Sequence, residues 1–322
     1  MNIGNIPYGA AWGMVRDVSY DRTRLKKQYL CRMGMTERYA AHTAYGGDCM
    51  RVCRFAMLLL TVMLLSMPVF AASDTAVVPI LMYHHFTVDP TRANGNCITA
   101  DAFARQLAAL SDAGYHSVTV ADCVDFVDCG VPLPDHPVLI TADDGYKSVL
   151  ELALPIADRY GFSMTVAVIG SHCTADTDGI PHFTLTEALS HPLTDRLELI
   201  SHTYDLHDAD GLGVTADPTA LPYDIARMRG MSGARKTEIG RVFAYPFGKW
   251  SCETERILRE AGYRATLAIR AGVYRVAVLR YEKPESLYAM PRIAVDGSID
   301  GVGLTGILAR ETAKVQAANF AS

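Results

Sequence analysis

The stretch Pro137-Val-Leu-Ile-Thr-Ala-Asp-Asp-Gly-Tyr146 is the most informative segment of the sequence for fold and chemistry alike. Its first six residues have the apolar character of a strand, and the strand runs directly into two adjacent carboxylates, Asp143 and Asp144. Neighbours on an extended chain point in opposite directions, so one carboxylate can bind a metal while the other stays free as a base. Asp-Asp-Gly is also an ordinary turn after a strand, so this stretch alone leaves both interpretations open.

Short strand-like runs continue along the chain on both sides of this stretch and alternate with helical patterns. The predicted strands are Val77–His85, His116–Val120, Pro137–Ala142, Met164–Ile169, Leu197–Ile200, Val242–Tyr245, Ala265–Ile269 and Met290–Val295. The predicted helices include Asp101–Ala113, Lys147–Tyr160 and Cys252–Ala261, each followed by glycine. This alternation predicts an α/β fold, a distorted or incomplete (β/α) barrel that forms a single catalytic domain over residues 73–322.

The segment before this domain has the pattern of a secretion signal. Residues 55–69 are apolar and uncharged, follow two arginines, and run into the small-residue pattern Val69-Phe-Ala71. We therefore expect residues 50–72 to be a signal peptide, or a signal anchor that tethers the chain through residues 55–70 if it is not cleaved. Residues 1–49 are expected to be a non-folded upstream segment or a cytoplasmic tail.

Composition narrows the classes of partner. Half of the 322 residues are hydrophobic, and the formal net charge is -5 with a pI near 6.0. This composition is that of a globular protein, and it lacks the basic excess that nucleic-acid binding usually requires. A nucleic-acid partner is therefore not expected, whereas a small molecule or neutral glycan fits.

Two histidines follow the predicted strand at residues 197–200 and stand five positions apart, as His202 and His207. On a regular helix this spacing places them on different faces, so binding one ion requires an irregular turn, which a strand end provides. Isolated histidines are more often surface or packed residues. Together with the carboxylate pair on another strand, they support the hypothesis of an Asp-His-His metal site.

Two further strand ends carry residues that could belong to the same site. Tyr245-Pro-Phe-Gly248 can aim a backbone N–H into a site, although an ordinary Pro-Gly loop has the same sequence. His84 and His85 end the first strand, and one of them could serve as a proton donor. Because side chains alternate along a strand, only one of the two can face the barrel mouth.

Together these four segments resemble the polysaccharide deacetylase family, which has the NodB-homology domain and is also called carbohydrate esterase family four. The resemblance covers roughly residues 77–297. The family's first motif, Thr-Phe-Asp-Asp-Gly, is present as residues 141–145 with alanine at the second position, and the second as His202-Thr203 with His207. Tyr245–Gly248, followed by Lys249-Trp250, matches the third motif of the poly-N-acetylglucosamine deacetylase-like branch, which the chain resembles most.

The resemblance implies a role for each of these positions. Asp143 is implied as the general base and Phe247 as the donor of a backbone N–H to the reaction. Asp144, His202 and His207 are implied as the ligands of a divalent metal ion, for which zinc is expected.

At two positions the chain departs from the family pattern, and each departure points to a further candidate site residue. The family often has an arginine where this chain has Ala244, so Arg292 is the candidate to orient Asp143. No histidine follows the second motif, although the family often places its acid there. In the poly-N-acetylglucosamine deacetylase-like branch the acid comes from the Tyr-His entry strand, which implies His84, with His85 as the alternative.

The implied function is metal-dependent removal of acetyl groups from an N-acetylated polysaccharide, such as peptidoglycan or an exopolysaccharide, with release of acetate. One alternative is an esterase that removes O-acetyl groups from xylan or another glycan. The other is a catalytically inactive glycan-binding protein on the same fold, which is less favoured because every residue of the metal site is present. The expected location is outside the cell, secreted or anchored at the bacterial cell envelope.

Overall fold

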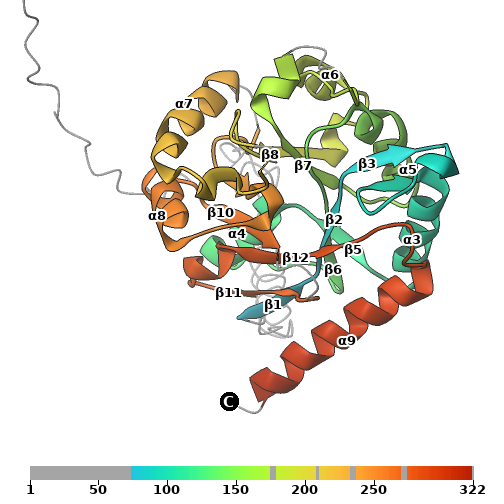
Figure 1. The fold of residues 1–322 in the computed structure, drawn as a ribbon. Helices are drawn as coiled ribbons and strands as arrows, with labels where there is room; N and C mark the ends of the chain where they lie inside the picture. Colours follow the sequence, from blue (N-terminus) through green and yellow to red (C-terminus); the bar gives the residue numbers. More distant parts are fainter. Residues whose placement is uncertain (1–73, 175–178, 208–209, 233–236, 270–273, 321–322) are drawn as a thin grey trace, which may run out of the picture. The chain divides into compact units, whose positions relative to one another are not determined.

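The computed structural model describes residues 74–174, 179–207, 210–232, 237–269 and 274–320. Within these ranges, seven parallel strands close into a barrel (Figure 1). Around the barrel they are β2 (Ile80–Tyr83), β12 (Met290–Ala294), β10 (Ala265–Ile269), β9 (Val242–Ala244), β8 (Leu197–Ser201), β7 (Met164–Val168) and β6 (Pro137–Ala142). The ring closes because β2 pairs with β12 on one edge and with β6 on the other. The predicted incomplete (β/α) barrel is confirmed, with seven strands in place of eight.

The described residues contain five further strands outside the ring. β5 (His116–Val118) pairs with the first half of β6, and β7 pairs with the second half. β1 (Thr75–Val78) pairs antiparallel with β11 (Ala277–Arg280), and β3 (His85–Thr87) pairs with β4 (Cys97–Thr99).

The first predicted strand, Val77–His85, was wrong in its extent, because the structure divides it among β1, β2 and β3. Pro79 separates β1 from β2, and a proline has no N–H with which to continue a ladder. Its carbonyl still accepts the Leu139 N–H at 2.9 Å. The chain thus changes partners twice within a run that looks continuous in the sequence.

The helices lie around the outside of the strands (Figure 1). They are α3 (Ala100–Asp112), α4 (Val120–Cys129), α5 (Leu154–Arg159), α6 (Leu185–Ser190), α7 (Leu221–Ser232), α8 (Cys252–Glu260) and α9 (Gly301–Phe320). Short 3-10 turns cover Pro90–Arg92, Gly170–Thr174, Thr194–Arg196, Gly213–Thr215, Pro218–Ala220, Pro246–Gly248 and Pro284–Leu287. No helix of the described residues is long and apolar enough to cross a bilayer. The predicted segments 1–49 and 50–72, including the apolar run 55–70, lie outside the described residues.

Local sequence explains where the helices begin and which face they bury. Thr99 caps α3 by accepting the Ala102 N–H, and the apolar residues of α3 at helical spacing are buried in the core. The predicted helix Lys147–Tyr160 begins instead as a π-helical turn, Val149–Ala153, before α5. Pro155 stands at the second position of α5, and its missing N–H interrupts the regular ladder there.

A buried glutamate joins one strand of the barrel to a surrounding helix. Glu198, on β8, accepts hydrogen bonds from the Val120 and Ala121 N–H groups, both at 2.9 Å. It also accepts the Thr165 hydroxyl at 2.6 Å. The first N–H groups of a helix have no partner within the helix, so Glu198 satisfies two donors at the start of α4.

We expect Glu198→Ala to lower the free energy of unfolding by about 3 kcal/mol, because it leaves two backbone donors and a buried hydroxyl without their acceptor. Chemical denaturation of the purified protein measures this loss. Glu151→Ala, at an exposed position of the π-helical turn, is the control and should change little. Equal stability of the two variants would contradict this role for Glu198.

Candidate active site

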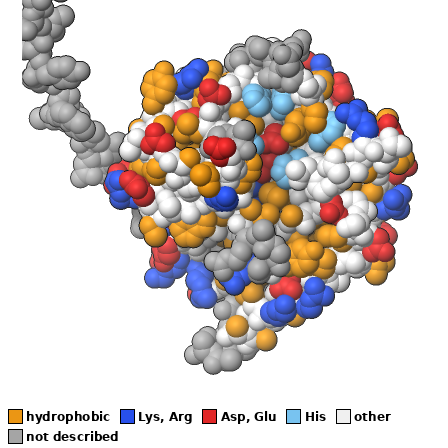
Figure 2. Space-filling view, in the orientation of Figure 1, with side chains coloured by type: hydrophobic (Ala, Val, Ile, Leu, Met, Phe, Trp, Pro, Cys, Tyr) orange, Lys and Arg blue, Asp and Glu red, His pale blue; other side chains and the backbone are white. Residues whose placement is uncertain are grey.

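The residues singled out in the sequence lie at the carboxyl ends of the barrel strands. Asp143 and Asp144 follow β6, His202 follows β8, and Phe247 follows β9. Parallel strands bring these ends to one rim, which is where barrel enzymes place their active sites. Figure 2 shows histidine side chains gathered around an acidic side chain in a hollow of this face.

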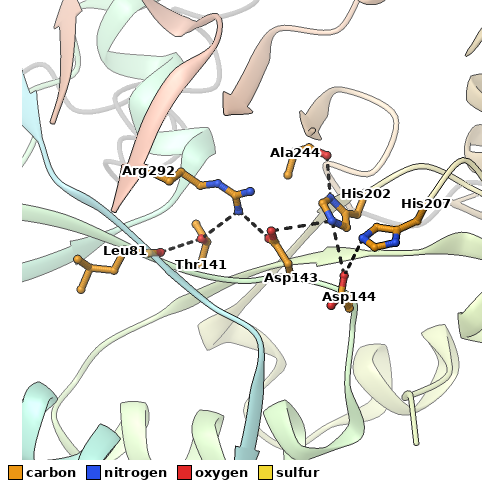
Figure 3. A network of polar contacts seen from close by, with 8 residues as sticks. All are labelled: Leu81, Thr141, Asp143, Asp144, His202, His207, Ala244 and Arg292. Atoms are coloured by element: carbon orange, nitrogen blue, oxygen red, sulfur yellow. Dashed lines mark hydrogen bonds and ion pairs between the residues drawn. The ribbon is translucent and has the colours of Figure 1, made fainter. Parts of the chain in front are cut away.

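Asp144, His202 and His207 converge at this rim (Figure 3). Asp144 Oδ1 lies 3.6 Å from Nε2 of His202 and 3.6 Å from Nε2 of His207. The candidate ligand atoms of all three residues lie within 4.8 Å of one another. Ligands of a tetrahedral zinc ion, each about 2.0–2.1 Å from the metal, are themselves about 3.4 Å apart. The three residues could therefore hold one ion with little movement.

The hydrogen bond of His202 fixes which ring nitrogen faces the site. Its Nδ1 lies 2.8 Å from the Ala244 carbonyl oxygen, and a carbonyl can only accept, so Nδ1 carries the hydrogen. Nε2 then presents its lone pair to the site, as a metal ligand must. Burial lowers the pKa of His202, although the nearby carboxylates Asp143 and Asp144 oppose this shift. Ala244 thus contributes through its backbone carbonyl.

An unusual backbone conformation follows three of the strands that carry the site. Asp144 has a φ of 74°, Thr203 a φ of 72° and Phe247 a φ of 56°. Positive φ is uncommon outside glycine, and for a β-branched residue such as threonine it is a real outlier. Such conformations persist where surrounding contacts hold them, and they often accompany functional sites. Here they turn the chain sharply at the rim.

Asp143 and Arg292 form a buried ion pair beside the three candidate ligands. Arg292 Nη1 lies 2.6 Å from Asp143 Oδ1, and the two residues are only 1% and 2% exposed, respectively. Burial alone would raise the pKa of Asp143, but the Arg292 guanidinium and His202 outweigh it and hold the pKa well below its usual range. Asp143 is therefore a carboxylate, and its partner Arg292 lies on β12.

His84 and His85 have different surroundings. His84, directly after β2, is close enough for its charge to lower the pKa of Asp143. His85 instead contacts Ser148, with Nδ1 2.8 Å from the Ser148 hydroxyl, and packs its ring 5.2 Å from that of Tyr146. Of the two, His84 is thus the one whose charge acts on Asp143.

Phe247 lies in the turn after β9, with its ring centroid 4.5 Å from that of His207. The residue is 41% exposed, and its ring lies against His207 at the edge of the candidate site. The next residue, Gly248, has a φ of 66°, and a Cβ there would lie 1.7 Å from Ile269 Cγ2. Only glycine fits at this position, which fixes the turn against β10. The sequence predicted a backbone role for Phe247 but not this contact of its ring.

A row of four rings beside the candidate metal ligands was not predicted from the sequence. The ring centroids of His85, Tyr146, His182 and His172 are separated in turn by 5.2, 4.7 and 4.6 Å. Burial and the neighbouring His172 lower the pKa of His182 to about 4, so its ring is neutral near pH 7. An isolated backbone bridge between Tyr146 and His182 brings this row together. Tyr146 and His182 are far apart in the sequence, and a contact between such segments leaves no periodic pattern in the sequence of either one.

Residues 130–266 match the polysaccharide deacetylase family. The chain carries a polysaccharide deacetylase domain. YxkH of Bacillus subtilis (strain 168), a protein assigned to the polysaccharide deacetylases, is 24% identical over 226 residues, 70% of this chain and 74% of the relative. The poly-beta-1,6-N-acetyl-D-glucosamine N-deacetylase of Escherichia coli (strain K12) is 24% identical over 218 residues, 56% of this chain but only 32% of that protein.

Solved structures share the fold of this polysaccharide deacetylase domain. IcaB from Ammonifex degensii superimposes with a TM-score of 0.57 at 24% identity, covering 72% of this chain and 96% of that one. The Streptococcus pyogenes deacetylase PplD superimposes with a TM-score of 0.59 at 20% identity, covering 72% and 98%. The predicted family and enzyme class, a hydrolase of the polysaccharide deacetylases, are confirmed.

Proposed function

We propose that the protein removes acetyl groups from an N-acetylated polysaccharide with the help of a divalent metal ion, zinc, held by Asp144, His202 and His207. The observation that carries this proposal is the convergence of these three side chains beside an ionised carboxylate, Asp143. One carboxylate and two imidazoles form a donor set that suits zinc. When bound, the ion would supply a Lewis acid that lowers the pKa of water and polarises the acetyl carbonyl.

The residues of this chain then divide the remaining tasks. Asp143 accepts the proton of the attacking water, and Arg292 keeps Asp143 ionised until it does so. The backbone N–H of Phe247 donates to the oxyanion that forms when water adds to the acetyl carbon. His84 gives a proton to the departing amine, so that water and the amide become acetate and a free amino sugar.

The proposed substrate is a neutral glycan that contains N-acetylglucosamine, outside the cell. The name of the Escherichia coli relative gives a poly-N-acetylglucosamine as its substrate. The neutral rings beside the site, including His182 and Tyr146, suit the faces and hydroxyls of an uncharged sugar. The signal-like segment at residues 50–72 supports an extracellular location at the cell envelope, by secretion or by a tether.

Acetate release by the purified protein tests this function. The substrates are N-acetylglucosamine oligomers, peptidoglycan and acetylated xylan, each with and without a chelator. We expect chelator-sensitive release from one or both of the N-acetylated substrates. Release from xylan alone would instead favour an O-acetyl esterase, and no release by zinc-loaded protein would favour a glycan-binding role.

The pH dependence of the reaction tests the pairing of Arg292 with Asp143. Arg292→Met removes the charge that lowers the pKa of Asp143, so this pKa rises. Because the base must be deprotonated, the acidic limb of the kcat/KM profile should move to higher pH, by about one unit or more.

Arg264→Met is the matched control for Arg292→Met, because it removes an arginine that pairs with Asp128 at the surface. The profile of this control should stay unchanged. An acidic limb at the wild-type position in Arg292→Met would show that Arg292 does not set the pKa of the base.

A further inference from the structure

The loop from His202 to His207 carries two of the three proposed ligands, and the present inference rests on that proposed metal site. Its backbone is irregular, because Thr203 has a φ of 72°. The Leu206 N–H donates to the Thr203 hydroxyl at 3.1 Å, which closes the turn from within. Threonine rarely adopts such a φ. The convergence of the two imidazoles therefore depends on contacts that hold this backbone in place.

The 3-10 turn Gly170–Thr174, which follows β7, holds the loop through two hydrogen bonds. The Gly170 N–H donates to the Thr203 carbonyl at 3.0 Å, and the Ser171 N–H donates to the Tyr204 carbonyl at 2.8 Å. A Cβ on Gly170 would lie 2.6 Å from Tyr204 Cδ2. Glycine at this position therefore permits close contact between the turn and the loop, and the two hydrogen bonds fix the Thr203 and Tyr204 carbonyls.

Helix α7 also holds the loop, through Asp224. Asp224 Oδ1 accepts the Tyr204 N–H at 2.8 Å, and Oδ2 accepts the Asp205 N–H at 2.9 Å. Asp224 is only 4% exposed, so these hydrogen bonds have little competition from water. A carboxylate that uses both oxygens on two successive N–H groups fixes the orientation of that peptide segment.

A second contact from the same helix supports this arrangement. Arg227 lies one turn after Asp224 on α7, and its guanidinium carbon is 3.7 Å from the centroid of the Tyr204 ring. Tyr204 is thus contacted through its N–H, its carbonyl and its ring. It lies two positions after His202 and three before His207, so its placement sets the path between them.

We propose that Asp224 is a positioning residue for the metal site. It fixes the Tyr204–Asp205 backbone, keeps Thr203 at positive φ, and thereby holds His207 within reach of an ion bound by Asp144 and His202. Asp224 acts through the loop and not by touching the ion. Without its carboxylate, two N–H groups lose their acceptor, and the loop is free to relax to a conformation in which the two imidazoles no longer converge.

Zinc affinity of the full chain tests this proposal. In Asp224→Asn an amide replaces one of the two accepting oxygens with a donor. We expect its zinc Kd, measured by competition with a chromophoric chelator, to rise by about 10- to 100-fold, as loss of a ligand-orienting partner typically does. We also expect the absorption spectrum of the Co²⁺-substituted protein to change, because this spectrum reports ligand geometry. The melting temperature of the zinc-free protein separately reports stability.

Asp217→Asn is the matched control. Asp217 also accepts a backbone N–H, that of Thr219 at 3.0 Å, but it is exposed and no residue of the ligand loop is among its hydrogen-bond partners. Its zinc Kd and Co²⁺ spectrum should equal those of the wild type. An unchanged zinc Kd and Co²⁺ spectrum in Asp224→Asn would overturn the positioning role.

Two further outcomes keep the proposals separable. A wild-type protein that binds no zinc would reject the metal site itself and not the role of Asp224 within it. If Asp224→Asn does not fold, Asp224→Glu decides, because it keeps the charge but moves the oxygens by one methylene. The proposal then predicts weaker zinc binding and an altered Co²⁺ spectrum, and wild-type values for both would overturn it.

Discussion

Replacing Asp143 with asparagine is expected to lower kcat by about 1,000-fold while zinc stays bound, because a general base contributes about 10² to 10⁴ in rate. The amide of asparagine cannot take the proton of the attacking water. Its oxygen can still accept from Arg292 Nη1, so the buried arginine keeps one hydrogen bond. Steady-state acetate release and the zinc content of the same preparation measure the two effects separately.

Asp101→Asn, at an exposed position of α3, is the control for Asp143→Asn and should retain wild-type turnover. Because Asp143→Asn also removes the charge that neutralises Arg292, its unfolding should be measured in parallel. Turnover near the wild-type rate in folded, zinc-loaded Asp143→Asn would show that another group is the base.

Removing one proposed ligand should have an effect of similar size on activity, by a different route. His207→Ala takes away one of the two imidazoles, and His207 is less buried than His202, so little core packing is lost. Loss of a residue that hydrogen-bonds to a ligand can raise a metal Kd by roughly 100-fold. Because His207→Ala removes a ligand itself, we expect its zinc Kd to rise by more than this. Acetate release should fall to background at low zinc and recover in part when zinc is added in excess.

His116→Ala is the control for His207→Ala. His116 is exposed at the start of β5, at the opposite end of its strand from the site rim. Zinc affinity and acetate release should not change in this variant. If His207→Ala bound zinc as tightly as the wild type, the ion would be held by a different set of residues.

The barrel strands could be predicted from the sequence because each is a short, continuous apolar run between helical patterns. The predicted bounds of the strands at residues 137–142 and 265–269 agree with β6 and β10. Other features depend on non-local partners. The division of the first strand at Pro79 reflects a change of pairing partner. Helix α9 begins with several glycines, which have low helix propensity, so the sequence argues against a helix there. Gly301 is required there because a Cβ would lie 2.6 Å from that of Ala109 on α3.

The site was predicted to the extent that its residues lie next to strand ends. Asp144, His202 and His207 each follow a strand, and parallel strands bring such residues together. By contrast, Asp224 lies within a helix whose sequence gives no sign of a contact with the ligand loop. The packing of His182 on Tyr146 likewise depends on a bridge between distant segments.

Titration of zinc into the metal-free protein, followed by acetate release from N-acetylglucosamine oligomers, tests whether deacetylation depends on one ion held by Asp144, His202 and His207. We expect no release without metal, and release that rises with zinc until one ion is bound per chain, with no such rise in Asp144→Ala. Full release by the wild type after complete removal of metal would contradict this dependence.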